Sequence, residues 1–182
     1  MNEKIIFSFG FRSKETVAVL PTLNDLAQEY PLRYLLISNP DGELDELDKA
    51  KKKYNFIDLQ VKALSLDELY DYLHASDVLL IHRESSQKYP AVLSSSVCQL
   101  LGSGCPILFH QSNYVELQGN EIVKYSNFED MKIKLKRIFQ GKFDLNIIKS
   151  FLKKYEAERV AEKFIKLFKE LGETQNQKRR VR

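Results

Sequence analysis

The sequence predicts a Rossmann-like, three-layer α/β domain with a parallel sheet of about six strands and a long C-terminal helix. Short apolar runs alternate with amphipathic segments of helical spacing through almost the whole chain. The run at residues 78–81 is apolar without interruption, which is typical of a strand buried on both faces of a parallel sheet. Regular alternation of strand and helix implies parallel strands joined by right-handed crossovers.

The chain of 182 residues, 43% hydrophobic and 29% charged, fits a single globular domain over residues 1–172, followed by a disordered basic tail at 173–182. The net charge is +3, and the tail carries four basic residues and one acid, so the body is neutral. A neutral body argues against a nucleic-acid-binding surface. No apolar run reaches the roughly 18 to 20 residues of a membrane span, and the N-terminus lacks a signal-peptide pattern.

The first half of the chain contains three predicted strands. Residues 4–9 form the first strand, and a helix over 15–30 follows, with Pro21 predicting either a late start or a kink. A second strand covers 33–38 and ends in an Asn-Pro-Asp-Gly turn. A charged helix at 43–54 then leads to the third strand.

The third strand is expected at 57–64. Ser65 and Glu68 have the spacing of a capping box, in which each side chain accepts a hydrogen bond from the other residue's backbone N–H. The helix behind this box is expected to bury its apolar residues, which are Leu66, Leu69, Tyr70 and Leu73.

The stretch from Asp77 to His110 is the centre of the predicted fold. A strand at 78–81, a short helix ended by Gly102, and a strand at 106–109 follow one another. A last strand is expected at 121–125, and Asn127 is expected to cap a helix that runs to Phe139. Gly141 separates this helix from a long amphipathic helix over about 144–171, which Gly172 ends.

Polar residues suited to an anion gather near strand ends, where ligands of open α/β sheets bind. Arg12 and Lys14 follow the first strand beside a helix N-terminus, which suits a phosphate or diphosphate. The alternative is that both are solvated loop residues. Ser94, Ser95 and Ser96 offer hydroxyl and backbone donors, although the triplet taken alone favours plain N-capping.

The remaining ionisable groups indicate binding more than catalysis. His82 and Arg83 follow a strand and could contact a sugar or phosphate; alternatively, His82 packs in the core and Arg83 pairs with Glu84. His74 and His110 read as structural. Neither a Ser/His/Asp triad nor a close carboxylate pair is recognisable, so no catalytic residue is assigned. The two cysteines lack partners at metal-site spacing, which predicts free thiols and no metal site.

Several of these features, in this order and spacing, resemble the C-terminal, donor-nucleotide-binding domain of GT-B glycosyltransferases of the family-four (group 1) type. They are a glycine, arginine and lysine after the first strand, a Ser65 to Val78 segment of the "s-x-x-E-L-x-x-x-L-x-x-S-D-V" type, a Gly102-Ser-Gly-Cys-Pro-Ile turn, and an "E-I-V-K-Y-S-N-F-E-D-M" segment. The resemblance covers about residues 4 to 170.

The resemblance implies a site for a nucleotide diphosphate sugar as substrate, with no further cofactor. Gly10, Arg12, Lys14 and Ser94 to Ser96 would hold the donor diphosphate, and His82, Arg83 and Gln99 the sugar and nucleoside. The family's Glu-x7-Glu motif falls on Ala91 and Gln99, so both carboxylates are replaced. This replacement puts transfer activity in question.

The function implied is the donor half of a hexosyltransferase of glycan or polysaccharide assembly, inactive alone and completed by an N-terminal acceptor-binding half or a partner subunit. A non-catalytic GT-B-derived module that binds a partner protein is the alternative, and half of a nucleotide-sugar epimerase ranks third. We expect a cytoplasmic protein. Weak contact between the basic tail and the inner face of a membrane is a further expectation, with a solvated tail as the simpler one.

Overall fold

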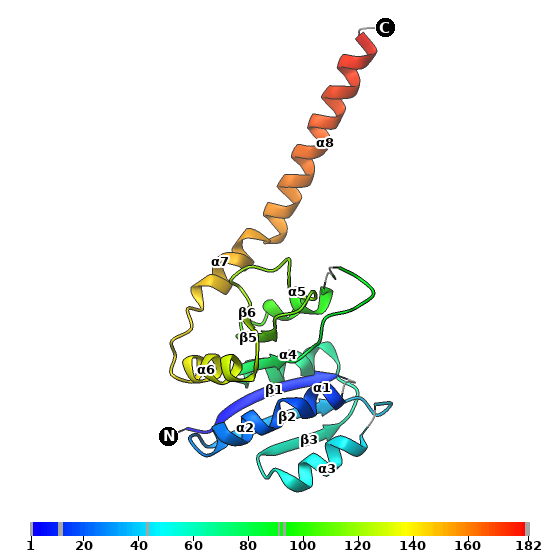
Figure 1. Cartoon of the computed structure of the whole chain (residues 1–182). Helices are drawn as coiled ribbons and strands as arrows, with labels where there is room; N and C mark the ends of the chain where they lie inside the picture. Colours follow the sequence, from blue (N-terminus) through cyan, green and yellow to red (C-terminus); the bar gives the residue numbers. More distant parts are fainter. Residues whose placement is uncertain (1, 11–12, 43, 91, 93, 181–182) are drawn as a thin grey trace. The chain divides into compact units, whose positions relative to one another are not determined.

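The computed structural model describes residues 2–10, 13–42, 44–90, 92 and 94–180; at 95, 96, 98 and 172–180 it describes the backbone alone. The chain divides into two units, Met1–Leu145 and Asn146–Arg182. In the first unit the elements are β1 (Lys4–Gly10), α1 (Ser13–Ala18), α2 (Leu20–Ala27), β2 (Leu32–Ser38), α3 (Asp45–Lys53), β3 (Ile57–Val61), α4 (Leu66–His74), β4 (Val78–Ile81), α5 (Ser95–Leu101), β5 (Ile107–His110), β6 (Val123–Tyr125) and α6 (Phe128–Phe139) (Figure 1).

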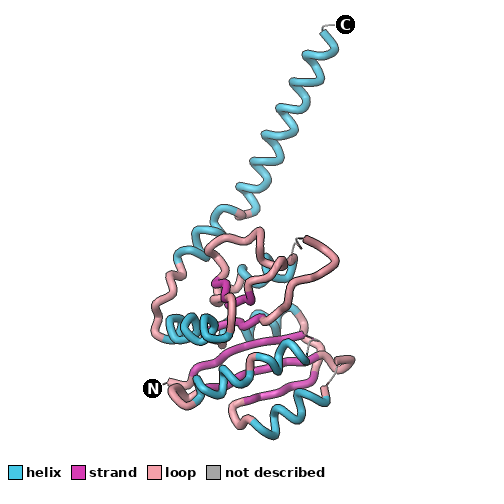
Figure 2. Tube along the Cα trace, viewed as in Figure 1, coloured by secondary structure: helices cyan, strands magenta, loops and turns pink. Residues whose placement is uncertain are grey.

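The strands form one parallel sheet in the order β3-β2-β1-β4-β5-β6. This is the order of the doubly wound Rossmann fold, in which the chain winds outward in both directions from the β1/β4 pair. Helices cover the sheet, as Figure 2 shows by colour. The predicted fold class is confirmed.

Successive residues of each strand point to opposite faces, and both faces are buried. On one face Ile6, Tyr34 and Leu80 pack with residues of α2, α3 and α6 in a single core cluster. On the other face the ring of Phe7 stacks on Tyr72 of α4, with 5.6 Å between ring centroids. Burial on both faces explains why these strands read as continuous apolar runs.

The helix starts that the capping residues predicted agree with the structure. Ser65 Oγ accepts from the Glu68 N–H and the Glu68 carboxylate accepts from the Ser65 N–H, so the capping box is confirmed. Asn127 caps α6 through its side chain. The predicted irregularity at Pro21 appears as a division into α1 and α2, with Pro21 in the first turn of α2, where its missing N–H is tolerated.

Four expectations need correction in this unit. The third strand ends at Val61 and not at residue 64, and the last strand begins at Val123. Leu66 is 52% exposed, because it occupies the first position of α4 and only Leu73 of that helix is fully buried. His74, read as structural, is exposed at the end of α4.

The second unit holds α7 (Asn146–Lys154) and α8 (Ala157–Arg180) in place of the single long helix expected from the pattern. The backbone is helical from Ala157 to Arg180, so the helix end predicted at Gly172 is wrong. Large apolar side chains of α8 are exposed, namely Phe164, Ile165, Leu167, Phe168 and Leu171. None of the described helices is long and apolar enough to cross a membrane.

Candidate functional site

A cavity of about 350 Å³ lies where β1 and β4 end, the point at which the chain reverses its winding direction. Ligands of open α/β sheets bind at this point, because loops from the two strands diverge and leave a crevice. The described lining comes from β1, β2, β4, β5, α1, α5 and the segments that follow α1 and β4 and precede α5. It comprises Ser8, Phe9, Gly10, Glu15, Thr16, Val19, Tyr34, Leu80, Ile81, His82, Arg83, Ser94, Val97, Leu100 and Phe109.

The end of β1 contributes Ser8 and the backbone of Gly10 to the lining of the cavity. Gly10 ends β1 with φ +128°, a conformation that L side chains rarely adopt, so only glycine fits there without strain. Ser8 is buried, and its hydroxyl donates to the Leu80 carbonyl at 2.5 Å, which joins β1 to β4. Burial raises the pKa of Tyr34 beneath them, against the opposing effect of its hydrogen bond with Ser8.

His82 lies on the opposite wall, directly after β4. Its side chain is 7% exposed, its Nδ1 lies 2.7 Å from Tyr125 Oη, and its Nε2 lies 3.4 Å from Glu84 Oε1. Burial is the main cause of a lowered His82 pKa; His110 lowers it further, while Glu84 and Glu15 oppose the shift. The ring is therefore neutral over a wider pH range than a free imidazole.

Arg83 supplies the permanent positive charge among the described lining residues. Its guanidinium carbon lies 3.6 Å from the centroid of the Tyr114 ring, an attractive cation–π arrangement. The buried Nε of Arg83 makes no hydrogen bond within the described structure. A flat guanidinium with a free donor suits an oxyanion of a ligand.

Asn113, in the loop after β5, holds the loop between β4 and α5. Its Oδ1 accepts from the Ser86 N–H at 2.9 Å, and its Nδ2 donates to the carbonyls of Ser86 at 2.8 Å and Tyr89 at 2.6 Å. Its backbone pairs with Ser85 Oγ and the Val92 N–H. The side chain and the backbone of Asn113 thereby both hold the loop that carries Glu84 and leads to Ser94.

The predicted binding residues divide into three groups. Gly10, His82, Arg83 and Ser94 line the cavity. Lys14 on α1 and Gln99 on α5 are exposed and are not among the lining residues; the Gln99 carbonyl accepts from Tyr70 Oη at 2.8 Å. Arg12, Ala91 and the side chains of Ser95 and Ser96 lie outside the described residues.

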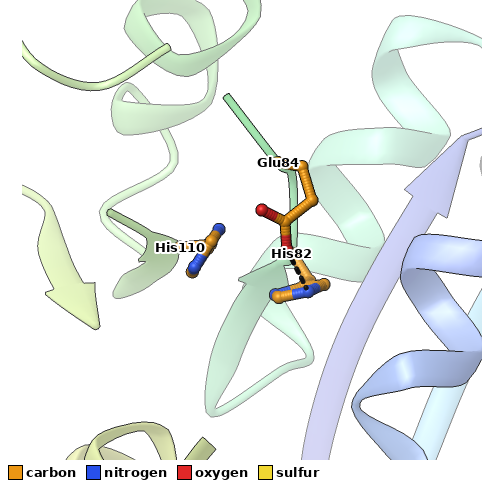
Figure 3. Close-up of side chains that lie close together, drawn as sticks. All are labelled: His82, Glu84 and His110. Carbon is orange, nitrogen blue, oxygen red and sulfur yellow. Dashed lines mark ion pairs between the residues drawn. The ribbon is translucent and has the colours of Figure 1, made fainter. Parts of the chain in front are cut away.

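Two features of the site were missed by sequence reasoning. Glu15 and Thr16 bring part of α1 into the lining. His110, read as structural, lies beside His82, with 4.6 Å between ring centroids, and with Glu84 these residues form a compact cluster (Figure 3). The signal was present: Leu-Leu-Ile-His at 79–82 and Ile-Leu-Phe-His at 107–110 end neighbouring strands in the same way.

A second cavity, of about 450 Å³, lies between the loop before β6 and the end of α6. Its lining includes Lys124, Lys134, Arg137 and Lys142, but two of these cations are already engaged. Lys124 Nζ donates to the Gln118 carbonyl and Lys134 Nζ to the Asp130 carboxylate. The first cavity is the better candidate site because it lies at the carboxyl ends of the strands.

Comparison with protein-family models and with curated proteins finds no match for this chain. Among solved structures, the α,α-trehalose 6-phosphate synthase from Burkholderia multivorans matches with a TM-score of 0.65 at 10% identity, over 95% of this chain and 44% of that one. The chain has the fold of a GT-B glycosyltransferase domain. A structure from E. coli bound with UDP-2-fluoro glucose matches with a TM-score of 0.60 at 13% identity, over 80% of this chain and 38% of that one.

The chain spans less than half the length of these structures. At such low identity the likeness concerns the fold, and it does not distinguish family four from other GT-B glycosyltransferases. The resemblance stated from the sequence is therefore confirmed at the level of the fold.

Proposed function

We propose that this chain is the donor-binding half of a glycosyltransferase and that the β1/β4 cavity holds a nucleotide diphosphate sugar. The observation that carries the proposal is the place and lining of the cavity. It lies at the switch point of the sheet, and its lining includes the Gly10 backbone and the Arg83 guanidinium. The 350 Å³ volume is within the range of small-molecule sites. A matching structure contains UDP-2-fluoro glucose, which supports this ligand class.

In this proposal the chain stabilises the leaving diphosphate and leaves the acceptor to another half or subunit. Arg83 donates to a phosphate oxygen, Ser94 adds a hydroxyl, and Arg12 and Lys14 follow the glycine at the end of β1. Positive charge and fixed donors around the diphosphate lower the barrier to its departure. No side chain of this chain is assigned to deliver or remove a proton.

The test is calorimetric titration with UDP, GDP and their sugar conjugates. Arg83→Gln is expected to weaken binding because it removes the cation that lines the cavity. The double variant Arg12→Ala/Lys14→Ala is expected to weaken binding because it removes two cations that follow β1. Lys49→Ala/Lys52→Ala, on the exposed side of α3, is the matched control and should bind as the wild type does. Equal affinity in all four proteins would refute the assignment.

A second candidate function, a non-catalytic module that binds a partner protein, is favoured by α8. Phe164 and Phe168 are 54% and 66% exposed and their rings stack on one side of the helix. Exposed aromatic residues of this kind mark interaction surfaces. Sedimentation of wild type and of Phe164→Ser/Phe168→Ser tests it: a self-associating wild type and a monomeric variant support this function, and two identical monomers count against it.

A further inference from the structure

His82, Glu84 and His110 bring three metal-ligating side chains together at the ends of β4 and β5 (Figure 3). The strand register explains the meeting: Ile81 pairs with Phe109, so the next residues of each strand, both histidines, lie side by side. Glu84 lies two residues after His82 in the following loop, and its carboxylate faces the His82 ring. One ligand atom from each residue lies within 4.8 Å of the other two.

Hydrogen bonds on the Nδ1 atoms leave the Nε2 atoms as ligands. His110 Nδ1 lies 3.1 Å from the Arg83 carbonyl oxygen, which can only accept, so Nδ1 carries the proton and Nε2 has the free lone pair. His82 Nδ1 lies 2.7 Å from Tyr125 Oη, while His82 Nε2 faces the Glu84 carboxylate at 3.4 Å. Metal-binding histidines are typically oriented in this way, by an oxygen partner on the second ring nitrogen.

We propose that His82, Glu84 and His110 bind a zinc ion through two imidazole nitrogens and one carboxylate oxygen. Tetrahedral zinc with bonds of about 2.0–2.2 Å places its ligand atoms roughly 3.3 Å apart. The His82–Glu84 distance already has this value, and the Glu84 side chain, 69% exposed, is free to adjust towards His110. Three protein ligands leave the fourth position for water or another oxygen donor.

The donor set favours zinc over the hard cations. Magnesium and calcium prefer oxygen ligands, whereas two imidazoles and a carboxylate suit zinc and its neighbours in the transition series. Glu15 adds a second carboxylate to the surroundings, since its Oε1 accepts from the Glu84 N–H at 3.4 Å. This negative charge further stabilises a divalent cation.

The zinc site does not depend on the proposed nucleotide site, because it rests on these side chains alone. One consequence does depend on the nucleotide site. Because His82 also lines the cavity, a cation bound there would offset the negative charges of Glu15 and Glu84 beside a diphosphate. Zinc binding is therefore measured without nucleotide, and failure of either proposal can be told from failure of the other.

The test uses the full chain after treatment with a chelator and its removal. Zinc titration against a chromophoric competitor is expected to show one ion per chain, and cobalt(II) is expected to give visible absorption bands of a low-coordinate site. Glu84→Gln, at an exposed side chain, and His110→Ala should each weaken binding by about tenfold or more. His74→Ala, at the exposed third histidine, is the matched control and should bind as the wild type does.

Circular dichroism checks that His110→Ala is folded. If it is not, Glu84→Gln alone tests the zinc site, because this substitution at an exposed side chain leaves the buried rings in place. Zinc binding that survives Glu84→Gln would place the ion elsewhere and overturn the proposal. Absence of stoichiometric zinc or cobalt binding in the wild type would overturn it as well.

Discussion

Replacing Asn113 by alanine should open the loop between β4 and α5 without unfolding the domain. The substitution removes three side-chain hydrogen bonds, at 2.9, 2.8 and 2.6 Å. Each contributes about 0.5–1.5 kcal/mol net. Because the loop is partly exposed and water replaces these bonds, we take a value towards the lower end, about 2 kcal/mol in total. This corresponds to roughly a 30-fold larger population of the open loop, since about 1.4 kcal/mol is a factor of ten.

Hydrogen exchange followed by mass spectrometry measures this population directly. In Asn113→Ala, amides of residues 85–89 should exchange about 30-fold faster, while those of β1 and β4 keep their wild-type rates. Asn120→Ala, at an exposed asparagine in the loop before β6, is the control and should leave both regions unchanged. Unchanged exchange at residues 85–89 in Asn113→Ala would refute the view that this side chain holds the loop.

Three further predictions concern stability and reactivity. Gly141 follows α6 with φ +68°, and its N–H donates to the Ile138 carbonyl. Gly141→Ala should therefore lower the free energy of unfolding, measured in urea, by about 1–2 kcal/mol. A change below about 0.3 kcal/mol, the size of an ordinary surface substitution, would argue against this prediction. Lys62 and then Ser65 lower the pKa of Glu68 from 4.5 to about 2, so its contribution to stability is complete above pH 4.5 and is lost as the pH falls towards 2. The melting temperature of Glu68→Gln should therefore vary less over this range than that of the wild type, and equal slopes would contradict the assignment. Burial raises the pKa of Cys105 to about 12, so iodoacetamide should label this thiol in urea but scarcely in the native protein; rapid native labelling would show that the site is open.

The charges in the cavity connect the two proposals. Arg83 is the permanent cation among the described lining residues of the cavity. Glu15 also lines the cavity, and its carboxylate accepts from the Glu84 N–H. Two carboxylates repel a diphosphate, so a donor there needs added positive charge. Under the two proposals, this charge would come from Arg12 and Lys14 after β1 or from a zinc ion on His82. Nucleotide titrations with and without zinc separate their contributions.

The sequence predicted the elements wherever the signal was local. Buried parallel strands produce continuous apolar runs, and β4 was predicted to the residue. Caps at Ser65 and Asn127 marked helix starts because one side chain decides each of them. These predictions required no knowledge of residues distant in the chain.

Features that depend on distant residues were predicted less well. The approach of His110 to His82 follows from the register of β4 with β5, which apolar runs alone do not specify. The division between α7 and α8 has no glycine or proline at residues 155–156 to signal it, and the apolar spacing continues across the break. Lys14 and Gln99 were expected at the site from their order in the chain, yet the direction of a helical side chain decides whether it reaches the cavity.

The most direct test of the donor-binding proposal is a map of where UDP protects backbone amides from exchange. The account predicts protection at residues 8–10, 13–16, 82–84 and 94–97, the segments around the β1/β4 cavity, with the cavity before β6 unaffected. Protection confined to residues 118–124, or no protection at UDP concentrations that saturate nucleotide-sugar enzymes, would contradict it.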